Sequence, residues 1–282
     1  MAQLGHLTPA DLEQAVALSR GVGWNQTADD WARLLALAPD GVFGAFAGGR
    51  LVASSSIVTY GGALAWIGMM IVAAEHRGRG LGKRLLDAAL ASPRVPPGAT
   101  VGLDATDMGA PLYRTRAFVD AEPIDRWGGA LRVTGFPEGT AVRAVEAADV
   151  APLAAWDAAT TGVGRAALVT HLLRAPGSRA WLATREGAPA GYAAVRPGHT
   201  HHHLGPLLAD DTAAFAALVA AIARELDGAP VYADVVRSPA TDAAFARAGL
   251  SVERRLTRMT RMHPRHVLSG GPIWATAGLE WG

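Results

Sequence analysis

The chain contains Arg77-Gly78-Arg79-Gly80-Leu81-Gly82, and this glycine loop decides which fold we expect. The apolar run 66–73 before it predicts a strand, and residues 81–91 after it are rich in helix formers. Glycine leaves no Cβ between the backbone and a ligand, and the N–H groups and dipole of a helix's first turn attract anions. A strand that turns directly into a helix here therefore predicts a pyrophosphate-binding site.

Cationic side chains surround this loop at Arg77, Arg79, Lys83 and Arg84. A Walker A loop would need Gly at position 77 and Ser or Thr at position 84, so arginine at both positions excludes it. A dinucleotide fingerprint requires a strand–helix–parallel strand unit, whereas two helices and a hairpin come first here. From the six residues alone, a basic helix cap with solvated arginines stays open.

The pattern on either side of the glycine loop predicts a mixed α+β order. Helices are expected at 8–19 and 27–37, and a hairpin of strands 42–46 and 51–59 turns at Gly48-Gly49. The third strand, 66–73, leads into the loop and its helix. A strand at 101–105, a short helix at 110–115 and a strand at 118–121 follow.

The same order begins again near Val142, which indicates duplication of a whole domain. Residues correspond at a spacing of roughly 130 to 140: Phe43 with Trp181, Gly49 with Gly187, Asp104 with Asp234, and 113–118 with 245–250. The linker is expected at Gly135-Phe136-Pro137-Glu138-Gly139. We therefore predict domains at 1–136 and 140–282. The second has helices at 148–158, 165–173, 213–226 and 241–248, strands at 181–185, 190–195, 231–235 and 250–256, and a last strand within 273–281.

Composition limits the classes of partner. The net charge is +1, which gives no global attraction to nucleic acid or to a membrane surface, and the absence of cysteine excludes disulfides and thiolate chemistry. No apolar run is long enough for a membrane span, and no secretory leader is evident. We expect a soluble, cytoplasmic monomer or homodimer.

Two motifs together resemble one known family. Arg77-x-x-Gly80-x-Gly82, between strand and helix, resembles the pyrophosphate loop of the GNAT acetyltransferases, and Leu112-Tyr113-Arg114-Thr115-Arg116-Ala117-Phe118 resembles that family's closing signature. The resemblance covers nearly all of residues 5–135. The second half resembles the degenerate partner domain of a tandem GNAT subfamily, and Gly23–Thr27 with Trp31 resembles that subfamily's loop between its first two helices. The resemblance implies two GNAT-like domains in an α+β fold of α/β/α layers around a largely antiparallel sheet.

The resemblance also implies a chemistry. A primary amine of a small molecule or peptide would attack acetyl-CoA directly, without an acyl-enzyme and without a metal. Tyr113 would be the general acid, because a phenol of pKa near 10 is protonated at neutral pH and can donate to a thiolate. The coenzyme would be held by Met70, Ile71, Val72, Arg77, Gly78, Arg79, Gly80, Leu81, Gly82 and Lys83, and the acceptor by Trp24, Asn25 and Gln26.

The general base is less well specified, because the strand 66–73 carries no carboxylate. Asp104 is our candidate, with Asp107, Glu75 and a water relay as alternatives. Asp234 corresponds to Asp104 in a half that lacks the other machinery, which favours a structural role for both.

The second half serves as an internal control. In place of the glycine loop it has the acidic segment 208–212, and in place of Tyr113 it has Phe245, so we expect neither coenzyme binding nor catalysis there. Three readings of His199, His201, His202 and His203 stay open: strand packing, a role between the domains or toward substrate, and a metal site. A coenzyme-binding sensor without turnover, and a transferase of longer acyl or aminoacyl groups, are the rival functions.

Overall fold

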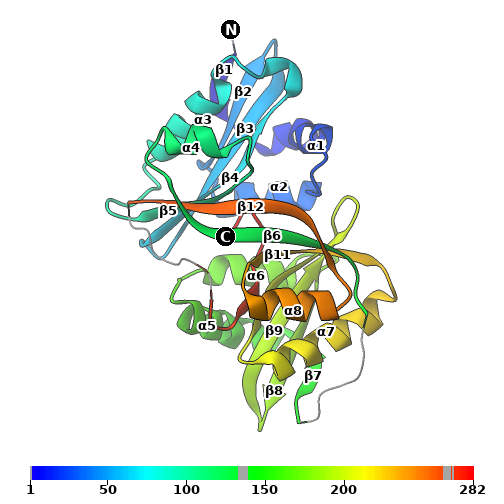
Figure 1. Cartoon of the computed structure of the whole chain (residues 1–282). Coiled ribbons are helices and arrows are strands. Elements are labelled where there is room, and N and C mark those ends of the chain that lie inside the picture. Colours follow the sequence, from blue (N-terminus) through cyan, green and yellow to red (C-terminus); the bar gives the residue numbers. More distant parts are fainter. Residues whose placement is uncertain (1, 133–138, 263–267, 269) are drawn as a thin grey trace.

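The computed structural model describes residues 2–132, 139–262, 268 and 270–282, which form one sheet with helices on both faces (Figure 1). The strands are β1 (Gln3–His6), β2 (Val42–Ala47), β3 (Arg50–Tyr60), β4 (Leu64–Val72), β5 (Thr100–Ala105), β6 (Val119–Ala130), β7 (Ala141–Ala144), β8 (Arg179–Arg185), β9 (Ala188–Arg196), β10 (His202–Ala209), β11 (Pro230–Val236), β12 (Ser251–Arg261) and β13 (Ile273–Ala275). The α-helices are α1 (Leu12–Gly21), α2 (Ala28–Leu37), α3 (Leu81–Leu90), α4 (Ala110–Arg114), α5 (Val150–Thr161), α6 (Ala166–Arg174), α7 (Thr212–Leu226) and α8 (Pro239–Arg247), with 3-10 turns at Pro9–Asp11, Ala74–His76 and Ala147–Asp149.

The predicted α+β class with a largely antiparallel sheet is confirmed. Among the described strands, only β4 with β5 and β10 with β11 pair in parallel. The helix boundaries follow from local capping: the Thr27 hydroxyl accepts from the N–H of Asp30, and the Asp30 carboxylate accepts in return from Thr27 at the start of α2. Asp211 caps α7 through its side chain, which accepts from the N–H of Ala214.

The two halves exchange their last long strands. The strand order is β1-β2-β3-β4-β5-β12-β6-β11-β10-β9-β8-β7, with β13 beside β10. Strand β12 of the second half thus lies between β5 and β6, and β6 of the first half pairs with β11 of the second. Figure 1 shows β12 and β6 crossing the middle of the molecule side by side.

The exchange of strands explains why the strand predicted at 118–121 is shorter than the observed β6. The sequence indicates a strand at 118–121, but β6 runs to Ala130, through Pro123 and two glycines that usually weaken strands. Its pairing with both β12 and β11 compensates, and such pairing between distant segments leaves no local signal. Strands β1, β7 and β10 were not among the predicted elements. The predicted linker at 135–139 falls almost entirely on 133–138, outside the described residues, so the division at 136 and 140 stays a prediction.

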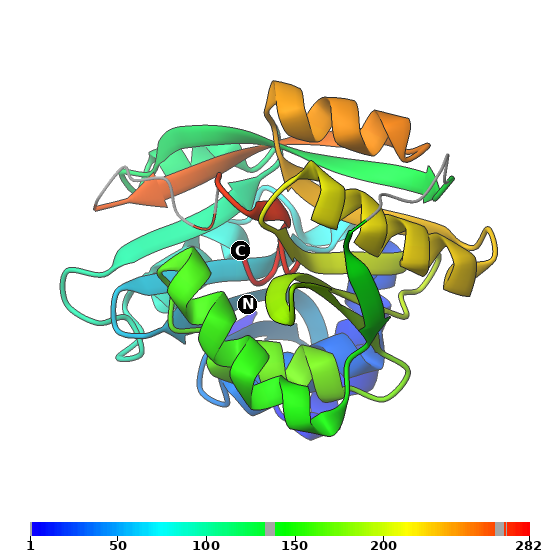
Figure 2. The same cartoon turned by 90° about the horizontal axis from the view of Figure 1, so that it is seen from below.

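Two hydrophobic clusters enclose the first half of the sheet. Leu81, Leu85 and Leu86 of α3 pack on one face with Tyr113 and Phe118. A second cluster, with Trp31 and Leu34 of α2, covers the other face and includes Leu168, Leu172 and Trp281 from the second half. The core is therefore shared between the halves, and Figures 1 and 2 both show the C-terminus in the centre of the molecule. Within the described residues, no helix is long and apolar enough to cross a membrane.

Candidate active site

The pocket opens where β4 and β5 separate. Their parallel pairing is limited to three residue pairs and ends with Trp66 opposite Gly102, although β4 continues to Val72. From Ile67 onward, the edge of β4 that faces β5 therefore lacks a strand partner within the described residues. Its backbone groups can hydrogen-bond an extended ligand. A cavity of about 560 Å³ occupies this gap and is lined by residues of both halves.

A bulge in β4 shapes the floor of the pocket. Met69 has a φ of 47°, in the left-handed region, and the register between β3 and β4 shifts at this point. The Ser54 hydroxyl donates to the Met69 carbonyl at 2.7 Å and holds the distorted backbone. The predicted coenzyme residues Met70, Ile71 and Val72 follow the bulge and line the cavity.

The glycine loop forms one end of the pocket, as the sequence predicts for a helix start. Gly78 and Gly80 have φ angles of 73° and 75°, and Gly80 is the N-cap of α3. A Cβ added at either position would meet no other atom within 4 Å, so the space in front of the loop is open. Of the predicted coenzyme residues, only Arg79 does not line the cavity. A pyrophosphate fits this cradle of N–H groups and cations.

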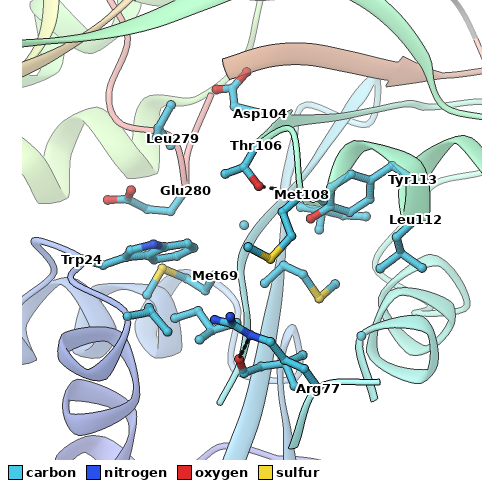
Figure 3. A pocket seen from close by; sticks show the side chains of 18 of the residues that line it. Trp24, Met69, Arg77, Asp104, Thr106, Met108, Leu112, Tyr113, Leu279 and Glu280 are labelled. Atoms are coloured by element: carbon cyan, nitrogen blue, oxygen red, sulfur yellow. Dashed lines mark hydrogen bonds between the residues drawn. The ribbon is translucent and has the colours of Figure 1, made fainter. Parts of the chain in front are cut away.

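Tyr113 lies on α4, on the side of the cavity away from Trp24 and Glu280 (Figure 3). Its side chain is buried, yet its hydroxyl points into the cavity and hydrogen-bonds no described residue (Figure 3). Burial raises the pKa of this phenol above its ordinary value. The hydroxyl is therefore protonated throughout the physiological pH range and is available as a proton donor.

Asp104 lines the pocket but is held in an ion pair. Both of its oxygens accept from Arg258 of β12, from Nε at 2.9 Å and from Nη2 at 3.1 Å. The guanidinium also lies over the Trp66 ring, 4.7 Å from its centroid. Burial raises the pKa of Asp104, and the positive charge of Arg258 opposes that rise.

The predicted acceptor loop divides into two parts. Trp24 and Gln26 line the cavity, whereas Asn25 does not. The Asn25 amide donates to the His201 carbonyl at 2.8 Å and accepts from the N–H of Thr200 at 2.9 Å, and the Asn25 carbonyl accepts from the N–H of His199. This side chain joins the first half to the segment 199–201 of the second.

The histidines of this segment differ in their surroundings: His199 and His201 contact the loop at Asn25, and His203 is buried in the sheet. His199 and His201 make these backbone contacts to Asn25, and the His201 ring stacks on Tyr232 at 3.9 Å between centroids. His203 is buried at the start of β10, and burial together with Arg196 lowers its pKa to about 3. The described residues contain no group of three or more side chains that could hold a metal.

Glu280 is a pocket residue that sequence analysis missed. The C-terminal segment crosses β4: the Trp66 indole donates to the Leu279 carbonyl, and the Tyr60 hydroxyl donates to the Trp281 carbonyl, both at 2.9 Å. Glu280 thereby lies beside Trp24, on the side of the cavity away from Tyr113 (Figure 3). The sequence predicted only a strand here, and of 273–281 only Ile273–Ala275 is one.

The Glu280 carboxylate is buried among polar partners. It accepts from Arg196 Nη2 at 2.9 Å and from Gln26 Nε2 at 3.1 Å, and Arg196 also contacts Asp30 at 3.1 Å. Burial is the largest influence on Glu280 and raises its pKa, while Arg196 lowers it. The cavity thus holds a second carboxylate besides Asp104.

The corresponding position of the second half carries different residues. Asp211, which replaces part of the glycine loop, uses its carboxylate to cap α7 and to bind Arg185 at 2.9 Å. Phe245, which replaces Tyr113, is fully buried against Phe215 and Trp127.

Comparison with known families finds a GNAT match in each half of the chain. The acetyltransferase (GNAT) family model matches residues 12–104, and an acetyltransferase (GNAT) domain model matches residues 132–269. The chain is 27% identical over 224 residues to holothin acyltransferase of Pseudoalteromonas sp. (strain SANK 73390), covering 79% of this chain and 74% of that protein.

Solved structures share the whole architecture. A putative acetyltransferase from Pyrococcus horikoshii superposes with a TM-score of 0.82 at 22% identity, over 100% of this chain and 96% of that one. A tandem GNAT protein from the clavulanic acid biosynthesis pathway superposes with a TM-score of 0.67 at 18% identity, over 94% and 100% of the two chains. At these identities the likeness concerns the fold.

Proposed function

This chain belongs to the GNAT acyltransferase family as a tandem of two such domains, and we propose that it transfers an acetyl group from acetyl-CoA to a primary amine by direct attack. One observation carries the proposal. The glycine loop, the unpaired edge of β4 and the Tyr113 hydroxyl all border a single cavity, and the equivalents of the loop and of Tyr113 in the second half have lost these features.

The coenzyme would lie with its pyrophosphate on the glycine loop and its pantetheine arm along β4. Gly78 and Gly80 give the phosphates access to the backbone, and the N–H groups that follow the bulge at Met69 can bind the thioester carbonyl as charge develops on it. When bound, the coenzyme supplies an activated acyl group. In the transfer a C–N bond forms, the C–S bond breaks, and the leaving thiolate gains one proton.

The chain's own residues handle the protons. Tyr113 would donate to the leaving sulfur, since its phenol stays protonated and points into the cavity. Asp104, the base predicted from sequence, stays a candidate, and Glu280 is a second one. Both oxygens of Asp104 accept from the Arg258 guanidinium. In Glu280, Oε1 accepts from the guanidinium of Arg196, whereas Oε2 accepts from the neutral amide of Gln26. Glu280 also lies beside Trp24, on the side of the cavity away from Tyr113. We therefore favour Glu280 as the proton acceptor.

Release of free thiol from acetyl-CoA across a panel of primary amines tests this function. Steady turnover that depends on both the amine and Tyr113 is expected. Tight coenzyme binding without turnover on any amine would instead identify an acyl-CoA sensor. Turnover with longer acyl donors but not with acetyl-CoA would overturn the acetyl assignment alone.

A further inference from the structure

The strand that the second half contributes to the first presents one more charged group to the pocket. Arg254, Leu256 and Arg258 alternate along β12, and their pairing with β6 is regular over this stretch, so the three side chains share one face of the sheet. Arg254 and Leu256 line the cavity, and Arg258 binds Asp104, which also lines it. The position of Arg254 on the pocket face thus follows from the strand register.

Two arginines from neighbouring strands, β12 and β6, line the cavity next to each other. Arg254 lies directly opposite Arg126 of β6, which also lines the cavity. Arg126 is neutralised, because Asp234 accepts from its Nε at 2.8 Å and from its Nη2 at 2.9 Å. It also lies over the Tyr232 ring, 5.2 Å from the centroid.

Arg254 has no such partner among the described residues. It forms no ion pair or hydrogen bond with them. The negative charge of Asp234 raises the pKa of Arg254 against the larger effect of burial, but the Asp234 carboxylate is already bound by Arg126. The side chain is half-buried; burial and the charge of Arg126 both lower the pKa of its guanidinium. A guanidinium in this position can bind a planar anionic group through two parallel hydrogen bonds.

The phosphates of the coenzyme have their own site. The glycine loop that would hold them follows β4, whereas Arg254 lies on β12, which is separated from β4 by β5 in the sheet. Glu280 lines the same cavity, and its carboxylate complements an ammonium group. The acceptor would share this cavity of about 560 Å³ with the pantetheine arm of the coenzyme, which favours a small molecule as acceptor.

We propose that the acceptor is a small amine that also carries a carboxylate, as an amino acid does, and that Arg254 binds this carboxylate. The inference rests on the proposed function and names its substrate class. In this arrangement the ammonium group lies toward Glu280 and the carboxylate toward β12. The second half then selects the acceptor, although it has lost the machinery of transfer.

The test uses the full-length protein, acetyl-CoA, and matched pairs of L-amino acids and their amides. Thiol release should show kcat/KM higher for the acid of an accepted pair by roughly tenfold or more, mainly through KM. Arg254→Gln should remove this preference, and Arg254→Lys should restore part of it. Arg255→Gln, which changes the exposed neighbour on the opposite face, is the matched control and should keep the preference.

A second measurement does not depend on turnover. Calorimetric titration of the same acids and amides into wild type and Arg254→Gln should show tighter binding of the acid only in wild type. Equal kcat/KM for acids and amides, or a preference that survives in Arg254→Gln, would overturn the inference and leave the proposed function intact. Selective binding of acids without any transfer would support Arg254 as the carboxylate site and overturn the transferase function.

Discussion

Arg258 of the second half binds Asp104 of the first through two hydrogen bonds, and Arg126 of the first half binds Asp234 of the second in the same way. Each aspartate lies on a fifth strand of its own half, and each arginine comes from the last long strand of the other. In both halves, the repeated Asp is thus buried and binds an arginine of the strand that the other half contributes. This relationship explains why Asp104 has a counterpart in a half without catalytic machinery.

Removing Asp104 should destabilise the protein strongly. Asp104→Asn removes the negative charge that the fully buried Arg258 binds through two hydrogen bonds, and we expect a loss of about 3–5 kcal/mol in the free energy of unfolding. Urea denaturation monitored by tryptophan fluorescence measures it. Asp120→Asn, which breaks the half-exposed pair with Arg114, is the control and should cost about 0–1 kcal/mol. Equal losses in the two variants would contradict the anchoring role.

Tyr113→Phe should lower kcat about a hundredfold or more while leaving the affinity for acetyl-CoA nearly unchanged. The substitution removes only the hydroxyl that points into the cavity, and the ring keeps its contact with Phe118. Thiol release gives kcat, and calorimetry gives the affinity. Thr115→Ala removes a hydroxyl from the exposed end of the same helix and should have no effect on either. An unchanged kcat in Tyr113→Phe would exclude this tyrosine from the reaction.

Gly80→Val should weaken coenzyme binding by at least tenfold. A branched side chain at a φ of 75° strains the N-cap of α3 and fills the open space in front of the loop. Gly48→Val imposes similar strain at a φ of 57°, in a hairpin outside the pocket, and serves as the control. That variant should lose stability but keep the affinity for acetyl-CoA. If both variants bind the coenzyme normally, the loop is not its site.

The pH profile should identify the proton acceptor. Burial raises the pKa of Glu280, and only its ionised form can take a proton, so kcat/KM should fall as the pH drops through that raised value. Glu280→Gln should remove this acid limb and lower kcat. In Asp104→Asn the limb should persist despite the loss of stability. Because burial raises the pKa of Asp104 as well, the opposite pattern would assign the base to Asp104, as the sequence suggested.

Gly68→Ala should displace the C-terminal segment. A Cβ on Gly68 would lie 2.8 Å from the Glu280 Cα and 2.9 Å from its carbonyl oxygen, both of them backbone atoms that cannot move aside alone. We expect a loss of about 1–3 kcal/mol in stability together with a loss of activity. Gly21→Ala, at a helical position with no atom within 4 Å of the added carbon, should be neutral or stabilising. Thermal unfolding with thiol release measures both effects.

The sequence by itself determined the local chemistry of the first half. Glycine spacing, the run of cations and the tyrosine signature are short-range patterns, and each directly specifies a backbone conformation or a functional group. The duplication was equally visible, since repeated residues need no structure to be compared. These signals predicted the α+β order, the helix start at the glycine loop and the loss of both motifs in the second half.

Only the tertiary structure decided how the halves share strands and which residues of the second half line the cavity. Pairing of β12 with β5 and β6, the passage of Glu280 past Gly68, and the position of Arg254 on the cavity wall join residues far apart in the chain. Such contacts depend on strand register and backbone approach, which no local pattern encodes. The glycine-loop end of the cavity, where we propose that the coenzyme binds, was therefore predictable from one segment, whereas the proposed acceptor end is built from both halves.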